Sequence, residues 1–144
     1  MGSMIDDVYL QRFVRAQSGV YDIALKEIRN GDKRSHWMWF IFPQLRGLGK
    51  SEMATFYGIA DLNEAIMYLA HPVLGTRLVE CCEAVLSNKE KSAYEIFGGI
   101  DAKKLRSSMT LFLVASDGNP VFKAVLDRFY DGKKDGATLK LLNL

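Results

Sequence analysis

The sequence predicts a mainly α fold: a compact single-domain bundle of about seven to eight short helices, with at most one or two short strands. Three observations lead to this prediction. Apolar residues step by three and four along most of the chain, as they do on one face of a helix. Ser, Asp and Asn stand where such stretches begin, and glycines stand where they end. The chain contains no internal repeat, linker or low-complexity segment, so a single core is expected.

Length and composition agree with one folded domain. The chain has 144 residues, of which 49% are hydrophobic and 25% are charged, within the range of ordinary globular proteins. Residues 1–3, ahead of Met4, look like the remnant of an expression tag. We therefore expect one globular domain over residues 4–144.

Charge and cysteine usage argue against several classes of function. The net charge is +2, with 19 basic and 17 acidic residues interleaved, so no nucleic-acid partner is expected. No apolar stretch is long enough to span a membrane and no secretory signal is present, so we expect no membrane partner and a cytoplasmic location. Cys81 and Cys82 are adjacent, which disfavours a disulfide between them, and we expect reduced cysteines with one facing the core. No metal or cofactor is expected, and the oligomeric state stays open.

In the first third of the chain the sequence predicts helices, except in one segment that could be a helix or a strand. Residues 7–30 predict one bent helix, or two short helices broken near Ser18 and Gly19, with Gly31 as the stop. In the segment 35–44, Ser35 could cap a helix that Pro43 ends, but the aromatic and β-branched content also suits a buried strand. We favour the helix.

The later helices are marked by residues that commonly start a helix. The expected starting positions are Ser51, Asp61, Pro72, Ser92, Asp101, Asn119 and Thr138. His71 is expected to cap the helix that follows it. The helix that begins at Asp101 carries many apolar residues, so we expect it to be central.

The segment 35–44 is also the first candidate for a functional site. It holds both tryptophans of the protein together with His36 and Gln44. Polar groups beside aromatic area are typical of small-molecule pockets. The following Gly49 and Lys50 suggest a phosphate loop, but Gln44 stands where that motif requires glycine, so a triphosphate loop is excluded. The segment could still bind a smaller anion, or be a plain connecting turn.

Motifs along nearly the whole chain match one known family. They are Arg12-Phe13 with Ala16-Gln17, Ser35-His36-Trp37-Met38-Trp39-Phe40-Ile41-Phe42-Pro43-Gln44, Gly47-Leu48-Gly49-Lys50-Ser51, Tyr57-Gly58-Ile59, Glu64-Ala65, His71-Pro72-Val73-Leu74-Gly75, and Asp101 with Lys104 and Ser107-Ser108-Met109. With these motifs the chain resembles the uncharacterised bacterial domain of unknown function 1810. The resemblance implies a compact, mostly helical domain and no established activity. Some members carry the label calpastatin-like, which this folded composition does not support, because an inhibitor of that kind is disordered.

The order of helices and scattered residues, from Ala16-Gln17 through Glu64-Ala65 to Thr138-Leu139, is also similar to the NADAR group. Members of that group are N-glycosidases acting on ADP-ribose-linked or riboflavin-precursor compounds. They carry a catalytic glutamate in a Glu-His-Tyr stretch, and this chain has Gln11, Arg12 and Phe13 in that register. If the activity is shared, another residue must activate water.

The leading functional hypothesis is a hydrolase or N-glycosidase acting on a nucleotide-derived or ADP-ribose-type small molecule. In this hypothesis the tryptophans stack on a base or sugar of the ligand, Arg12 and Lys50 bind its phosphate, and the glutamines form hydrogen bonds with its polar edges. The candidate residues are Arg12, Gln17, Trp37, Trp39, Gln44, Lys50 and Tyr57 for ligand binding, and His36 and Asp101 for acid–base catalysis. Two alternatives stay open: a non-catalytic ligand-binding module, and an interaction protein in which the tryptophans and His36 are core residues.

Overall fold

The computed structural model describes residues 2–144, with side chains from residue 9 onward, and these residues form a bundle of ten α-helices. Six of them have seven or more residues, and no strand forms within residues 2–144, so the mainly α prediction is confirmed. The helices are α1 (Gly2–Gln17), α2 (Tyr21–Arg29), α3 (Met38–Ile41), α4 (Glu52–Phe56), α5 (Leu62–Ala70), α6 (Leu74–Leu86), α7 (Ala93–Phe97), α8 (Gly99–Ala115), α9 (Pro120–Tyr130) and α10 (Gly136–Leu141).

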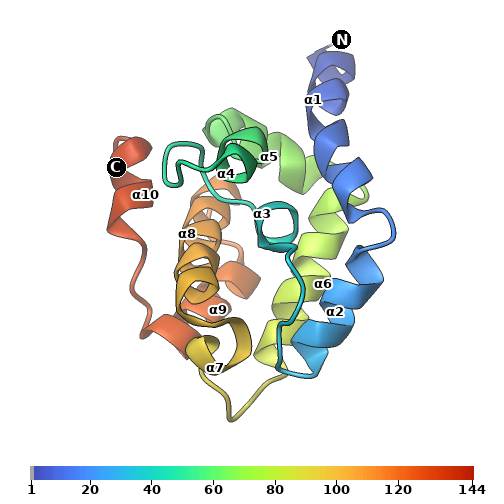
Figure 1. Cartoon of the computed structure of the whole chain (residues 1–144). Coiled ribbons are helices and arrows are strands. Elements are labelled where there is room, and N and C mark those ends of the chain that lie inside the picture. Colours follow the sequence, from blue (N-terminus) through green and yellow to red (C-terminus); the bar gives the residue numbers. More distant parts are fainter. Residues whose placement is uncertain (1) are drawn as a thin grey trace.

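Helix α8 forms the centre of the bundle, as its apolar sequence predicts. It packs against α5, α7, α9 and α10 (Figure 1). Its buried residues include Leu105, Met109 and Phe112. Helix α6 packs against α2, α5 and α9. Helix α1 contacts α3 and α5. The short helix α3 therefore sits beside the long helix α1, which supports the aromatic segment.

The first helical region is broken where glycine permits it. Of the two predicted alternatives, the structure has two helices, because Gly19 adopts a φ of +75° between α1 and α2. Gly31 likewise has a φ of +67° after the end of α2, which confirms the predicted stop.

The ambiguous aromatic segment forms a loop and only one turn of helix. Helix α3 begins at Met38, with Trp37 as its N-cap residue and no side-chain cap. Ser35, the predicted cap, instead donates its hydroxyl to Oε2 of Glu27 at 2.6 Å. The helix prediction is correct for residues 38–41, and the cap assignment is wrong because a long-range partner on α2 takes the Ser35 side chain.

Glu27 organises this loop through four hydrogen bonds. Its carboxylate accepts the Ser35 hydroxyl, the backbone N–H groups of Arg34 and Ser35, each at 3.0 Å, and Nε1 of Trp37 at 2.9 Å. Burial raises the pKa of Glu27, but the hydrogen bonds from Ser35, Arg34 and Trp37 outweigh it and lower the pKa from 4.5 to about 2. The ionised carboxylate thus stabilises the loop.

Replacing Glu27 by glutamine should make stability less dependent on acid pH. Because the folded pKa lies below the unfolded one, the stabilisation by ionised Glu27 is present above pH 4.5 and is lost as the pH falls toward about 2. We expect Glu27→Gln to lower the free energy of unfolding by roughly 1–3 kcal/mol at neutral pH, and the difference from wild type to shrink across this window. Urea unfolding as a function of pH measures both effects. Glu90→Gln, in an exposed loop, is the control, and a Glu27 difference that stays constant with pH would contradict the assignment.

Most predicted helix starts are confirmed by side-chain caps. Ser51, Asp61, Ser92 and Asn119 each accept a backbone N–H in the first turn of the following helix. His71 accepts the N–H groups of Val73 and Leu74 through Nδ1.

Three starting positions differ from the prediction. Helix α6 begins at Leu74 rather than Pro72, and α10 begins at Gly136, where Asp135 is the cap. Helix α8 begins at Gly99, so Asp101 lies inside its first turn and is not a cap. Its carboxylate pairs with lysines instead, as described below.

Three further features complete the fold. A single parallel bridge between Leu45 and Ile59 joins the loops before α4 and α5. Cys81 and Cys82 are free and both buried, and burial raises the pKa of both thiols, that of Cys81 to about 12. Within residues 2–144, no helix combines the length and apolar character needed to cross a membrane.

Candidate functional site

The aromatic segment divides its tryptophans between the core and the surface. Trp37 exposes 0% of its surface, and its ring packs near Phe42 and Phe97 with centroid separations of 6.4 Å. Trp37 was a candidate for stacking on a ligand, but the structure places it in the core. Trp39 is only partly buried and reaches a cavity.

That cavity has a volume of about 320 Å³ and lies between the loop before α3 and the start of α8. We call it the motif cavity and define it by Lys33, His36, Trp39, Phe97 and Asp101. His36 is exposed at its edge, and Asp101 comes from the first turn of α8. The two predicted acid–base residues, far apart in the chain, therefore line the same cavity.

The charges around the motif cavity favour anions. Nζ of Lys33 lies 2.8 Å from Oδ2 of Asp101, and Nζ of Lys104 lies 3.7 Å from Oδ1. The Lys33 side chain is only 6% exposed, and it also donates to the Ser35 carbonyl at 2.6 Å and lies over the Trp37 ring. Two ammonium groups thus share the Asp101 carboxylate, so Lys33, Asp101 and Lys104 together carry one positive charge.

Trp39 stands between the motif cavity and a much smaller void. Nζ of Lys104 lies 4.9 Å from the centre of its ring. Its Nε1–H is buried and has no hydrogen-bond partner within residues 9–144. On the other side, Gln44 and Tyr57 border a void of about 10 Å³, room for one water at most. Gln44 and Tyr57 are therefore near the motif cavity but do not line it.

Gln17 belongs to a buried polar network rather than to a cavity. Its Nε2 donates to the Phe40 carbonyl at 2.8 Å and to the Tyr68 hydroxyl at 3.3 Å, and its Oε1 accepts from Nη1 of Arg77 at 3.2 Å. Gln17 is 1% exposed. This predicted ligand-binding residue instead joins α1 to α3, α5 and α6.

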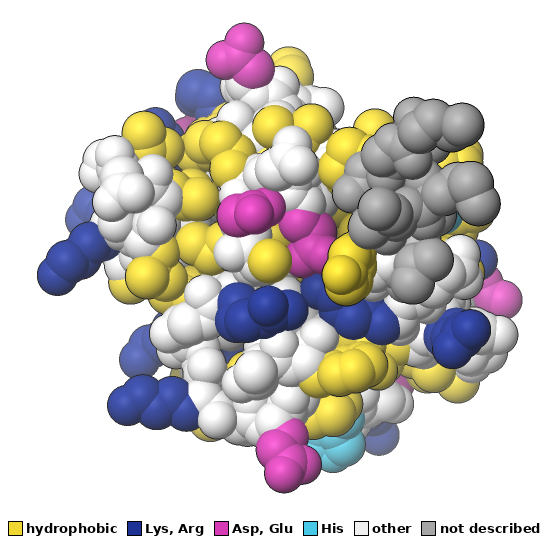
Figure 2. All heavy atoms as spheres, turned by 90° about the horizontal axis from the view of Figure 1, so that it is seen from above, with side chains coloured by type: hydrophobic (Ala, Val, Ile, Leu, Met, Phe, Trp, Pro, Cys, Tyr) yellow, Lys and Arg dark blue, Asp and Glu magenta, His cyan; other side chains and the backbone are white. Residues whose placement is uncertain are grey.

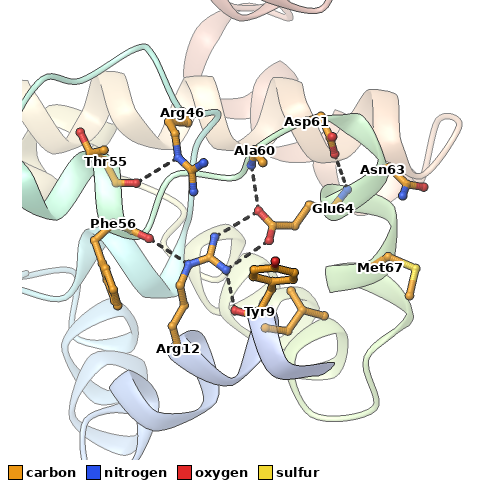
Figure 3. A pocket seen from close by; sticks show the side chains of 11 residues that line it. Tyr9, Arg12, Arg46, Thr55, Phe56, Ala60, Asp61, Asn63, Glu64 and Met67 are labelled. Atoms are coloured by element: carbon orange, nitrogen blue, oxygen red, sulfur yellow. Dashed lines mark hydrogen bonds and ion pairs between the residues drawn. The ribbon is translucent and has the colours of Figure 1, made fainter. Parts of the chain in front are cut away.

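Arg12 lines a separate and larger cavity of about 540 Å³ between α1, α4 and α5 (Figure 3). We call it the Arg12 cavity; its charged and aromatic lining residues are Tyr9, Arg12, Arg46, Phe56, Asp61 and Glu64. Figure 2 views the molecule from this side and shows acidic and basic side chains next to apolar ones.

All five N–H groups of Arg12 are already bonded. Nη1 and Nη2 each lie 3.1 Å from one carboxylate oxygen of Glu64, and the other donors reach the carbonyls of Tyr9, Phe56 and Gly58. Arg12 was predicted to hold phosphate, but in this arrangement it has no donor left for a ligand.

Lys50 lines neither cavity. It is exposed and lies in an open groove with Met53 and Phe56 on α4. Gly49 beside it serves packing, because a Cβ at this position would lie 2.7 Å from the Cβ of Ala54. A plain connecting turn, the alternative to an anion site, is therefore sufficient to explain Gly49-Lys50-Ser51.

Sequence reasoning missed four charged residues that line the two cavities and one that lies beside them. The lining residues are Lys33, Arg46, Asp61 and Glu64, and Lys104 pairs with Asp101 beside the motif cavity. The helical spacing of Asp101 and Lys104 signals their pairing, and the spacing of Asp61 and Glu64 predicts a capping box, of which the structure forms only the Asp61 cap, because the Glu64 carboxylate bonds to Arg12 and the Ala60 N–H. The partners Lys33 and Arg12 lie far away in the chain, so no local pattern shows them.

Comparison with known proteins identifies the family. The model of a family described as "Protein of unknown function (DUF1810)" matches residues 7–142. This chain belongs to the DUF1810 family. It is similar to the conserved hypothetical protein Rv1873 from Mycobacterium tuberculosis, whose crystal structure superposes with a TM-score of 0.92 at 52% sequence identity. The match covers 94% of this chain and 96% of Rv1873.

A search of the curated proteins finds no match to this DUF1810 chain. None of these comparisons shows the similarity to the NADAR group, which stays a prediction. The family is therefore established, and no specific activity follows from it.

Proposed function

We propose that this DUF1810 protein binds a nucleotide-derived small molecule, such as an ADP-ribose-type compound, in the motif cavity. The observation that carries the proposal is that His36 and Trp39, from the aromatic segment, and Asp101, from α8, line one cavity. The sequence predicted all three as functional residues. Their meeting at one cavity supports a common role.

The chemistry of the cavity suits such a ligand. The net positive charge of Lys33 and Lys104 around Asp101 attracts phosphate, and the Trp39 ring offers a surface for a base or sugar. A volume of about 320 Å³ is near the lower end for ligand pockets, which run from about 300 to 1,000 Å³, so one part of a dinucleotide should enter.

A second proposal is that the bound compound is hydrolysed at its N-glycosidic bond. It is favoured by the presence of a carboxylate and an imidazole at the same cavity, together with the similarity to the NADAR group described above. The Asp101 carboxylate can stabilise positive charge that develops on the sugar ring, and His36 can transfer a proton to the leaving nitrogen or from water. A binding module without catalysis predicts affinity but no turnover.

Thermal unfolding in the presence of ADP-ribose, NAD and AMP tests binding. A ligand at about 100 times its dissociation constant should add roughly 2.7 kcal/mol of stability and raise the Tm by several degrees. The shift should be lost in His36→Ala, whose side chain is exposed and has no hydrogen bond within residues 9–144, so its stability should be unchanged. Lys89→Ala, another exposed change on a distant loop, should keep the shift.

Product analysis then separates the two proposals. Release of the base, lost in Asp101→Asn, supports hydrolysis, whereas binding without release supports a module. The absence of any shift with all three compounds, or an unchanged shift in both His36→Ala and Asp101→Asn, would overturn the site.

A further inference from the structure

The Arg12 cavity offers a binding surface that the proposed function does not use. It shares no lining residue with the motif cavity. Its volume of about 540 Å³ lies well within the range of small-molecule pockets, about 300–1,000 Å³. The Arg12–Glu64 ion pair forms part of the cavity wall, and the donors of Arg12 are all used within the protein. The other polar groups of the wall therefore decide which ligand the cavity can bind.

Two of these remaining groups are anchored and carry opposite charge. Arg46 donates from Nε to the Thr55 carbonyl and from Nη2 to the Gly58 carbonyl, each at 3.1 Å, and its Nη1 has no partner within residues 9–144. Asp61 accepts the Glu64 N–H through Oδ1 at 2.9 Å, and its Oδ2 has no partner among the same residues. The cavity therefore presents one guanidinium edge and one carboxylate oxygen, both held in place by backbone contacts.

The apolar part of the cavity suits a ring. Tyr9 and Phe56 line it and expose 61% and 58% of their surfaces, and Met67 lies half-buried between helices. Figure 3 shows Arg46 and Asp61 on one side of the cavity and Arg12 and Tyr9 on the other. Because Tyr9 and Phe56 line the same cavity, their exposed rings belong to one apolar surface, and contiguous apolar surface of this kind commonly marks a binding site.

We infer that the Arg12 cavity is a second binding site, which takes a zwitterionic aromatic compound of the amino-acid type. Arg46 binds the carboxylate of the ligand, Asp61 binds its ammonium group, and Tyr9 and Phe56 pack against its ring. The charges of Arg12, Arg46, Asp61 and Glu64 cancel, so this cavity does not attract a polyphosphate as the motif cavity does. The inference is independent of the proposed function.

Calorimetric titration of the full chain with three related compounds tests the two charges separately. L-Tryptophan carries both charges, tryptophanamide lacks the carboxylate and N-acetyl-tryptophan lacks the ammonium group. Loss of one charge-assisted hydrogen bond should weaken binding by about tenfold or more, so both derivatives should bind less tightly than L-tryptophan.

One variant isolates the role of Asp61. Asp61→Asn keeps a side chain that caps α5 equally well but removes the charge. It should weaken L-tryptophan binding by about tenfold and leave N-acetyl-tryptophan binding unchanged. Phe56→Ala should weaken binding of all three compounds, and Tyr94→Ala, an exposed aromatic outside this cavity, should change none of them.

Several outcomes would overturn the inference. They are no binding of L-tryptophan, L-tyrosine or L-phenylalanine at millimolar concentration, equal binding of L-tryptophan and its two derivatives, or unchanged L-tryptophan binding in Asp61→Asn. These titrations do not depend on nucleotide binding in the motif cavity, so the inference and the proposed function can fail independently.

Discussion

Trp37→Ala should lower the free energy of unfolding by about 3–5 kcal/mol. The side chain is fully buried, so its removal leaves a large cavity between α3, α7 and the loop before α3. The change also removes the indole N–H that Glu27 accepts and the ring over which Lys33 lies. Chemical denaturation monitored by circular dichroism measures the loss.

Two matched variants separate packing from hydrogen bonding at Trp37. Trp37→Phe keeps most of the buried area but loses the bond to Glu27, so it should cost less than Trp37→Ala. Tyr94→Ala deletes an aromatic side chain that is 71% exposed and should change stability by less than about 0.5 kcal/mol. A Trp37→Ala protein as stable as Tyr94→Ala would contradict the core assignment of Trp37.

The fold could be predicted wherever its determinants are local. Ser51, Asp61, Ser92 and Asn119 cap helices through backbone groups only two or three residues away, so sequence spacing is sufficient to find them. The loop at Ser35 could not be predicted in the same way, because its hydroxyl bonds to Glu27 on α2. A capping residue is thus assigned reliably only when no distant partner competes for it.

In the candidate site too, distant partners decide which of the predicted residues remain available to a ligand. His36 and Asp101 are brought to one cavity, and Trp39 joins them. Gln17 and Arg12 have the polar character of ligand-binding residues, but partners on α3, α5 and α6 or near α4 satisfy them. The sequence shows which polar groups exist, whereas only the fold shows which of them are already bonded.

The second large effect is expected at the ion pair between Arg12 and Glu64. Both side chains are about 13–14% exposed, and the pair joins α1 to α5 through two N···O contacts of 3.1 Å. Arg12→Met removes all five donors and leaves the Glu64 carboxylate with only the Ala60 N–H. We expect a loss of roughly 2–4 kcal/mol in the free energy of unfolding, because one buried charge loses its partner.

A double-mutant cycle distinguishes a lost pair from a general loss of packing. Arg12→Met combined with Glu64→Leu removes both charges, so the double variant should be more stable than the sum of the single effects predicts. The exposed pair Lys123–Asp127, at 2.7 Å, is the control, and its cycle should give only about 0.3–0.5 kcal/mol. If the Arg12–Glu64 coupling were equally small, the pair would not be what fastens α1 to the bundle. The stability of the Arg12 cavity wall would then have to come from the carbonyl contacts of Arg12 alone.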